Sequence, residues 1–592
     1  MRTLLRTAIV LFLFTGTLFG AELRSFSRYV PDDTILFAEA NELELVWDSI
    51  VTSNFWGQFK SLKALDQLGI LDKIAEMQNE FKSLTGFSLS QQNVMALLGK
   101  KSAVSVYAEP GKEGAPVRIE LFFIAQCNPR KTVEDMLSKL VEKAREEMRS
   151  EALFTSIVYN DKKIYSIRPR GEDASVEIRY VYDGDVVILG IGNMRPRVEK
   201  YLDCSIQKVD SLERNSQYLK IRTIISPVRG APLLITYIDI SKLNSIKSSV
   251  EEEDLDILAL VDGIASILGT GRAAGISVTV DKGVKTKAIV LPTEENPSEL
   301  EKIRKAVQPA VGAHRNYVPG NTLLYYAVNN MPDLIKAYPE VVNAWQAAPH
   351  QTFLAQFIEQ IDISLNIDIQ KDVLPFVGNE LAFLFAGVDI KQYDFPMPLA
   401  AIIIKVKDGD KAAAFVDKII EAVRDGMPEG PPAIEFKPQS HEGVKIYVLE
   451  IPNTLGPDAE SIKPCYVLIN DFLIVGSSVD QIKSMIDVSK GRKRGLTGTT
   501  VYRASGIPER NNSSLFIDWQ GITNHATLSA EWLVKFAEGA GIGEQVRQTV
   551  EDHIGPIINV LSVIQHISSY KINTPQGEET ISYIGLEDLP GF

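Results

Sequence analysis

The sequence has little cysteine and little histidine, three and six residues respectively among 592. An odd, sparse set of cysteines excludes a disulfide framework, and at most one bridge can form among Cys127, Cys204 and Cys465. Whether one forms is left open by the sequence. No two histidines stand at the HExxH or HxH spacing of a local metal site. The sequence therefore offers no local support for a metal site or for a histidine general base.

Motifs for nucleotide binding and nucleophilic catalysis are also missing. No GxxxxGK[ST] loop occurs, and Gly190-Ile-Gly192 follows an expected strand without a third glycine. Gly476-Ser-Ser lacks the second glycine of a GxSxG nucleophile turn. Cys465 falls within an apolar segment, which favours a buried structural thiol over a nucleophile. We therefore predict no catalytic residue, no metal ligand and no cofactor, and the ligand-binding residues stay unknown.

Long apolar runs are missing beyond the first 20 residues. The basic start Met1–Arg6 precedes the apolar run Ala8–Phe19, which is too short to span a hydrocarbon core of about 30 Å comfortably. Small residues follow at Gly20 and Ala21. The three parts together predict a signal peptide over residues 1–20 and an exported protein, periplasmic or extracellular. An uncleaved N-terminal anchor remains the alternative.

Positive charge is in the minority, with 62 basic and 76 acidic residues and a formal net charge of −14. An acidic surface repels phosphate backbones, which disfavours nucleic acid as a partner. The compact basic run Lys490–Arg494 is interpreted as a solvated loop. An envelope protein or an apolar ligand is the partner that we expect, and the oligomeric state stays unknown.

An internal repeat is the strongest positive signal in the chain. Tyr29–Phe37, YVPDDTILF, recurs as Tyr317–Tyr325, YVPGNTLLY, and an Asn follows each copy at the same distance, at Asn41 and Asn329. A chain of 592 residues exceeds the roughly 250–300 residues that one hydrophobic core organises, so at least two domains are expected. The repeat predicts that these domains share one fold.

Further matched segments follow in the same order, at offsets between 279 and 288 residues. They are Val94–Gly99 with Val373–Gly378, Leu121–Ala125 with Ala400–Ile404, Lys163–Tyr165 with Lys445–Tyr447, Tyr180–Gly190 with Tyr466–Gly476, and Ile235–Asp239 with Ser514–Asp518. We therefore expect one unit at 25–295, a linker at 296–311 and a second unit at 312–592.

Each unit is predicted to be α+β, with antiparallel sheets and packed helices. Asp183-Gly184 and Asn470-Asp471 each separate two strand-like runs, as a tight hairpin turn does. Helical periodicity appears in blocks at Glu42–Ser61, Leu71–Leu84 and Lys131–Arg149. Runs of strands and runs of helices, without strict alternation, are typical of the α+β class.

The residues shared by both copies are typical of a scaffold. Proline suits the start of a strand, glycine permits a tight turn, and Asn or Asp can cap a following helix. The shared residues are Tyr29/Tyr317, Pro31/Pro319, Thr34/Thr322, Asn41/Asn329, Gly99/Gly378, Tyr165/Tyr447 and Asp239/Asp518.

The Val-Pro-x-x-Thr-x-x-(Phe/Tyr) element and Val373–Ala382, VLPFVGNELA, resemble a bacterial family of secreted proteins of unknown function. So does Lys445–Tyr447 followed by Tyr466–Gly476 and a helix. The resemblance implies export and a duplicated α+β unit, and it brings no activity and no functional residue. We expect an exported, non-enzymatic binding or envelope-structural protein. A carrier of lipid or another apolar ligand, and a periplasmic hydrolase with a site assembled from both copies, stay open as alternatives.

Overall fold

The computed structural model divides the chain into two compact units, unit 1 within Met1–Glu295 and unit 2 at Asn296–Glu587. The predicted signal peptide lies outside the residues that the structure describes. Those residues are 25–42, 48, 52–60, 62, 70–88, 90–109, 117–148, 152–170, 176–193, 195–227, 232–247, 271–280, 283–293, 297, 299–332, 337–339, 367–389, 397–425, 435–450, 463–539 and 542–587.

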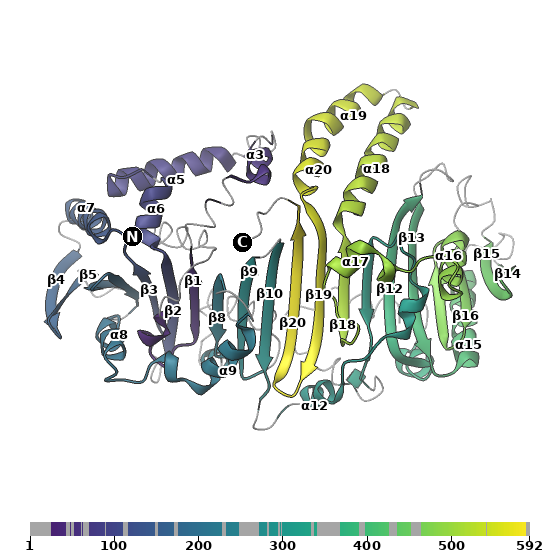
Figure 1. Cartoon of the computed structure of the whole chain (residues 1–592), viewed down its shortest axis with the longest axis horizontal. Coiled ribbons are helices and arrows are strands. Elements are labelled where there is room, and N and C mark those ends of the chain that lie inside the picture. The colour runs from purple at the N-terminus through teal and green to yellow at the C-terminus, as the bar shows by residue number, and fades with distance from the viewer. Residues whose placement is uncertain are drawn as a thin grey trace. The chain divides into compact units, whose positions relative to one another are not determined.

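Unit 1 contains an antiparallel sheet of ten described strands (Figure 1). Neighbouring strands follow the order β4-β5-β6-β7-β3-β2-β1-β8-β9-β10. The strands are β1 (Leu36–Asn41), β2 (Lys101–Glu109), β3 (Arg118–Gln126), β4 (Ala152–Tyr159), β5 (Lys162–Pro169), β6 (Glu177–Asp183), β7 (Val186–Gly192), β8 (Leu234–Ile238), β9 (Ala273–Val280) and β10 (Gly283–Leu291).

Helices cover both faces of this sheet. The main core packs Phe37, Phe122 and Tyr237 of the sheet against α8 (Val198–Ser205) and α9 (Ser216–Ile225). The opposite face carries Phe123, which together with Met95 of α6 (Gln91–Leu98) packs against Ala40 and borders a cluster with α7 (Arg130–Met148). Because successive strand residues point to opposite faces, Phe122 and Phe123 reach different layers.

The sequence predicted several of these elements closely. The Asp183-Gly184 turn joins β6 to β7, with Gly184 at φ 61°. The expected helix Leu71–Leu84 appears as α5 (Ile70–Thr85) and Lys131–Arg149 as α7. Part of the expected helix Glu42–Ser61 lies outside the described residues; Glu42, at φ 57°, is not helical, whereas residues 48 and 52 and α3 (Asn54–Lys60) are.

Unit 2 also contains an antiparallel sheet of ten described strands, in the order β14-β15-β16-β17-β13-β12-β11-β18-β19-β20. They are β11 (Leu324–Val328), β12 (Val377–Asp389), β13 (Met397–Val406), β14 (Glu435–His441), β15 (Val444–Glu450), β16 (Cys465–Ile469), β17 (Phe472–Gly476), β18 (Ser513–Asp518), β19 (Ile564–Thr574) and β20 (Gly577–Leu586).

The main core of unit 2 lies between this sheet and three short elements. These are the 3-10 helix η3 (Ala313–Tyr317), α16 (Val479–Ser489) and α17 (Thr500–Ala504). A second cluster packs α15 (Gly409–Asp425) on the sheet around Tyr466 and Leu473.

A helical hairpin follows β18. It consists of α18 (Trp519–Gly539), α19 (Gly543–Thr549), a short π-helix and α20 (Gly555–Leu561), and it extends past the ends of the strands of its own unit (Figure 1). Among the helices that the structure describes, none combines the length and apolar character needed to cross a bilayer. The protein is thus a mixed α+β fold with antiparallel sheets, as the sequence predicted.

Candidate functional site

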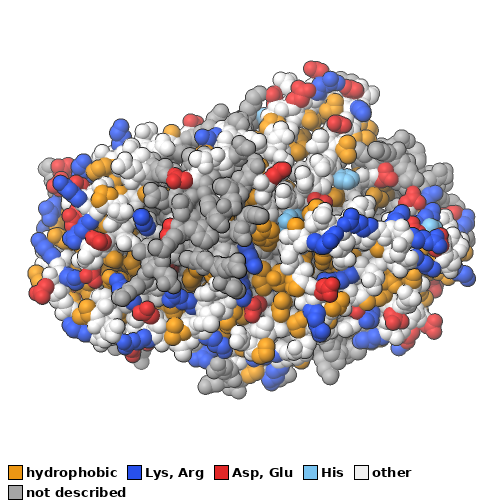
Figure 2. Space-filling model, in the orientation of Figure 1, with side chains coloured by type: hydrophobic (Ala, Val, Ile, Leu, Met, Phe, Trp, Pro, Cys, Tyr) orange, Lys and Arg blue, Asp and Glu red, His pale blue; other side chains and the backbone are white. Residues whose placement is uncertain are grey.

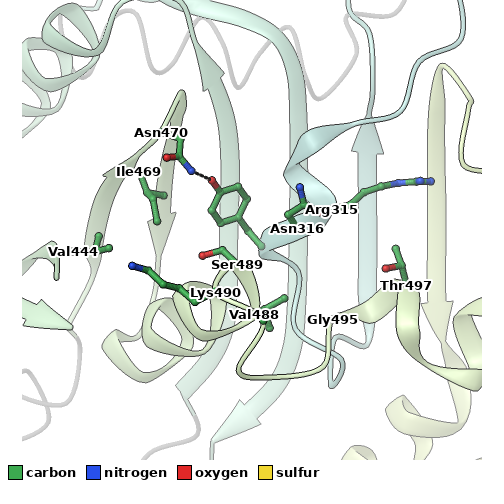
Figure 3. Close-up of a pocket in the computed structure, with 12 residues that line it drawn as sticks. Arg315, Asn316, Val444, Ile469, Asn470, Val488, Ser489, Lys490, Gly495 and Thr497 are labelled. Atoms are coloured by element: carbon green, nitrogen blue, oxygen red, sulfur yellow. Dashed lines mark hydrogen bonds between the residues drawn. The ribbon is translucent and has the colours of Figure 1, made fainter. Parts of the chain in front are cut away.

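A pocket of about 570 Å³ opens in unit 2 beside Tyr317 (Figure 3). Four pieces of chain form it: η3, the start of β15 at Val444, the tight turn between β16 and β17, and the C-terminal end of α16 with the loop after it. Most of the side chains that line it are polar, among them Asn316, Asn470, Ser489, Lys490 and Thr497. None of the described lining residues is acidic.

The β16–β17 turn positions the amide at one side of this pocket. Asn470 has a φ of 51°, which asparagine tolerates better than most residues in a two-residue hairpin turn. Its side-chain Nδ2 donates to the Tyr317 hydroxyl at 2.7 Å, and Figure 3 shows this bond. Burial is the main cause that raises the pKa of Tyr317 above its ordinary value, so the hydroxyl is protonated at neutral pH.

Two cations line the pocket, and they are oriented differently. The Lys490 amino group donates to the carbonyl oxygen of Glu442 at 3.1 Å, which leaves further donor capacity on the ammonium. Arg315 donates through Nη2 to the carbonyl oxygen of Pro508 at 3.3 Å, and its guanidinium points away from Asn470 and Lys490 in Figure 3. Lys490 is therefore the charged group best placed to meet a ligand.

The loop after α16 contains the basic run that the sequence singled out. Arg492 pairs with Glu442, and Lys493 lies 3.3 Å from Asp487. The same Asp487 is 2.8 Å from His441 Nε2, and this hydrogen bond is the main cause that lowers the pKa of Asp487. The side chains of Arg492 and Lys493 are more than half exposed, as in a solvated loop.

A buried carboxylate anchors η3 behind the pocket. Glu380 on β12 accepts hydrogen bonds from the Ala313 backbone N–H at 2.6 Å and from Lys405 at 2.8 Å. His314 Nδ1 lies 3.1 Å from the same carboxylate. Burial by itself would raise the pKa of Glu380, but hydrogen bonds from His314 and Lys405 outweigh it and lower the value to about 2. Burial also lowers the pKa of His314, so the pair is carboxylate and neutral imidazole at pH 7.

Unit 1 contains a network of buried ion pairs that the sequence analysis missed. Glu120 on β3 is fully buried and pairs with Arg118 and Arg197. Arg179 on β6 is 1% exposed and forms a bidentate salt bridge with Glu199, in which Nη1 and Nη2 donate to the two carboxylate oxygens at 2.5 and 2.6 Å. The alternation Arg195-x-Arg197-x-Glu199 was the only local signal of it in the sequence.

Asp33 extends the network toward the surface, accepting from Lys200 at 2.6 Å and from Arg197 at 3.2 Å. Burial by itself would raise the pKa of Asp33, but the hydrogen bond from Lys200 and the charges of Arg197 and Lys200 lower it overall. Removing one partner from such a network leaves a buried charge without compensation, so each member is needed by the others.

The three cysteines are free and buried. Burial raises the pKa of Cys127 to about 11 and those of Cys204 and Cys465 to about 12. The thiolate is the nucleophilic form, so these thiols are unreactive at neutral pH. Among the described residues, no group of three or more His, Cys, Asp or Glu side chains is placed to hold a metal ion.

The residues shared by the two halves have structural partners. Asp239 and Asp518 do cap helices, each accepting a backbone N–H three residues on, at 3.0 and 2.9 Å. The side chains of Asn41 and Asn329 donate to backbone carbonyl oxygens 191 and 182 residues away, at Pro232 and Asn511. The residues that would begin a helix after each of them, 43–47 and 333–336, lie outside the described part of the chain, so their capping role stays a prediction.

One family model matches part of the chain. Residues 147–394 match a family described as "Protein of unknown function (DUF3352)". The match begins in unit 1 and ends in unit 2, so it does not coincide with either unit. No curated protein matches the chain at a significant level. The resemblance to a family of unknown function is thus confirmed for this region, and it assigns no activity or site residue.

Proposed function

We propose that the protein is an exported, non-enzymatic binding protein built from two copies of one α+β unit, with its ligand site in the unit 2 pocket. The pocket is the observation that carries the binding role. Its volume of about 570 Å³ falls within the usual range of small-molecule sites. Amide, hydroxyl and ammonium groups converge on it from three separate parts of the chain.

The lining indicates the chemistry of the ligand. Lys490 and two asparagine amides supply donors, and the described lining has no carboxylate to compete for them. This local positive character contrasts with the net charge of −14 of the whole chain. A small polar molecule with an anionic oxygen, such as a carboxylate, satisfies these donors best.

Native mass spectrometry of the protein purified from the cell envelope tests this assignment. We expect a small anionic molecule to co-purify, and we expect Lys490→Ala to reduce its occupancy at least tenfold. Lys493→Ala is the matched control, because Lys493 is close in sequence but pairs with Asp487. Equal retention in both variants would contradict the site, and a co-purifying protein without a ligand would favour an envelope-structural role.

The order of the strands supports the duplication. In unit 1, neighbouring strands of the sheet follow the order β4-β5-β6-β7-β3-β2-β1-β8-β9-β10. The sheet of unit 2 has the same order when ten is added to each strand number. In both sheets the third strand pairs with the seventh, and the first with the eighth. A non-sequential order of this kind seldom arises twice by chance.

Matched side-chain contacts support it further. Tyr165 stacks on Tyr180 with ring centroids 4.8 Å apart and planes 12° apart, and Tyr447 stacks on Tyr466 at 4.9 Å and 11°. Backbone hydrogen bonds correspond as well: Leu212 N to Val30 O and Leu496 N to Val318 O, Asp239 N to Ile35 O and Asp518 N to Leu323 O, and Cys127 N to Asp185 O and Val406 N to Asp471 O.

The two units differ at the turn that borders the pocket. In unit 1 the β6–β7 turn has Gly184 at φ 61°, at the position that corresponds to Asn470, at φ 51°, in unit 2. In unit 2 the β16–β17 turn carries Asn470, which donates to Tyr317. Divergence at one turn of a shared scaffold is what a ligand site confined to one copy requires.

Export rests on the N-terminal sequence. Mass spectrometry of the N-terminus of protein isolated from cells is the direct measurement, and we expect a chain that starts near Ala21. Recovery of Met1 in a membrane fraction would instead support an anchor.

One observation favours the alternative of a carrier for an apolar ligand. Tyr326, Phe383, Ile402 and Val475 stand directly opposite one another across β11, β12, β13 and β17, and each is 37–42% exposed. Such a row of apolar side chains on a sheet face offers contact to an acyl chain. A fluorescent fatty acid should then bind with an affinity that Phe383→Asp lowers at least tenfold, whereas Val158→Asp on β4 leaves it unchanged. Binding unaffected by Phe383→Asp would remove this candidate.

A further inference from the structure

The end of the helical hairpin in unit 2 exposes large apolar side chains. We call the described residues 532–539 and 542–547 the hairpin tip; they comprise the end of α18 and most of α19. Phe536 is 64% exposed, Ile542 54% and Leu533 41%. Trp532 stacks on Phe536 with ring centroids 5.3 Å apart and planes 19° apart. The tip therefore presents aromatic and aliphatic surface where the hairpin extends past the strands of its unit (Figure 1).

The tip is held in shape by contacts between its two helices. The Ile542 backbone N–H donates to the carbonyl oxygen of Ala537 at 3.0 Å, and Arg547 pairs with Glu538. A Cβ on Gly543 would lie 2.4 Å from the Glu538 side chain, so the close approach of the helices requires glycine there. Phe536 and Ile542 are thus exposed from an ordered hairpin.

Charge and size indicate what covers this surface. The tip contains two basic and two acidic residues, Lys535, Arg547, Glu538 and Glu544, and so has no net charge. Figure 2 shows apolar side chains along the hairpin and charged side chains of both signs at its end. The three exposed apolar side chains together present roughly 300 Å² of solvent-accessible surface. That is well below the roughly 800 Å² per partner of a stable protein interface.

We infer that the hairpin tip binds the surface of a lipid bilayer, with Phe536, Ile542 and Trp532 at the level of the lipid headgroups. Tryptophan is favoured at that depth because its ring system is apolar and its N–H can still reach water, and Phe536 and Ile542 add apolar area that the acyl boundary buries. A tip without net charge needs no anionic lipid, and a surface of this size gives reversible attachment. The inference is independent of the pocket and of its ligand.

Flotation with lipid vesicles tests the inference. The chain beginning at Ala21 is used, because an uncleaved Met1–Gly20 would bind vesicles by itself. We expect it to float with phosphatidylcholine vesicles, with no more than a twofold gain when a third of the lipid is anionic. Phe536→Ser with Ile542→Ser should lower the bound fraction at least fivefold. Val158→Ser is the control, since Val158 is 74% exposed on β4 in unit 1.

A second readout places the tip itself at the membrane. Lipids brominated near the headgroup should quench part of the tryptophan fluorescence, and Trp532→Phe should remove that part while the protein still floats. Circular dichroism checks that each variant is folded. The inference is overturned if the wild type does not float, if the double variant floats as well as the wild type, or if binding needs anionic lipid. A dimer that forms without lipid and is lost in the double variant would also overturn it, in favour of a second copy of the chain.

Discussion

Replacing Glu380 by Gln removes the charge that anchors η3 in unit 2. The carboxylate accepts hydrogen bonds from the Ala313 N–H and from Lys405, and it lies 3.1 Å from His314 Nδ1. Its pKa is about 2 in the folded protein against an ordinary value of 4.5. At about 1.4 kcal/mol per pKa unit, the ionised form contributes about 3 kcal/mol to the free energy of unfolding at pH 7.

The pH dependence follows from the direction of the shift. A carboxyl group whose pKa is lowered by folding stabilises the protein above its unfolded pKa, and the stabilisation is lost as pH falls from 4.5 toward 2. The wild type should therefore exceed Glu380→Gln by about 3 kcal/mol at pH 7 and by only about 1.4 kcal/mol at pH 3. The lowered pKa of His314 acts in the same direction, because stability declines once pH falls below 6.5.

Urea denaturation of both proteins between pH 7 and pH 3 measures these differences. Glu450→Gln is the control, because the side chain of Glu450 is 51% exposed and its pair with Lys437 lies at the surface. A surface pair of this kind contributes about 1 kcal/mol or less. A Glu380→Gln effect no larger than that of the control, or one independent of pH, would refute the assigned role of the carboxylate.

Three further predictions concern the scaffold. Gly99→Ala should lower the free energy of unfolding by at least about 2 kcal/mol, because the new Cβ would lie 1.7 Å from a backbone carbonyl oxygen. Gly184 has a similar positive φ but open space around it, so Gly184→Ala should cost only about 1 kcal/mol, and equal costs would contradict the steric argument. Arg179→Met should cost about 3 kcal/mol in denaturation because it leaves the partly buried Glu199 without its two-pronged partner, whereas the exposed Arg195→Met should cost about 1 kcal/mol or less. The native protein should show almost no thiol reactive with Ellman's reagent at pH 8 and three thiols after unfolding, and a fast-reacting thiol in the native state would contradict the burial of the cysteines.

The elements that sequence reasoning predicted well are those that depend on neighbouring residues. Asp183-Gly184 and Asn470-Asp471 form the expected hairpin turns, because a positive φ at glycine or asparagine is a local preference. The helices α5 and α7 were predicted to within one residue at each end, since apolar residues recur at helical spacing within each segment. The ends of the helix expected at Glu42–Ser61 fall partly outside the described residues, and only Glu42 itself, at φ 57°, is seen to be non-helical.

The candidate sites were not predictable in the same way. The lining of the pocket comes from residues 315–317, 444, 469–470 and 488–497, and no local motif links these positions. The Asn41 side chain donates to the carbonyl oxygen of Pro232, 191 residues away, a contact that no local sequence pattern predicts. The pairing of Arg179 with Glu199 likewise depends on β6 packing against α8.

By itself, the sequence determined the α+β class, the antiparallel hairpins and the places of the main helices, because backbone preference and apolar periodicity act over a few residues. Only the tertiary structure decided which charges are buried together, where a pocket opens and which apolar side chains at the hairpin tip stay exposed. Those outcomes depend on contacts between residues tens to hundreds of positions apart, and their energies arise when distant segments exclude water together.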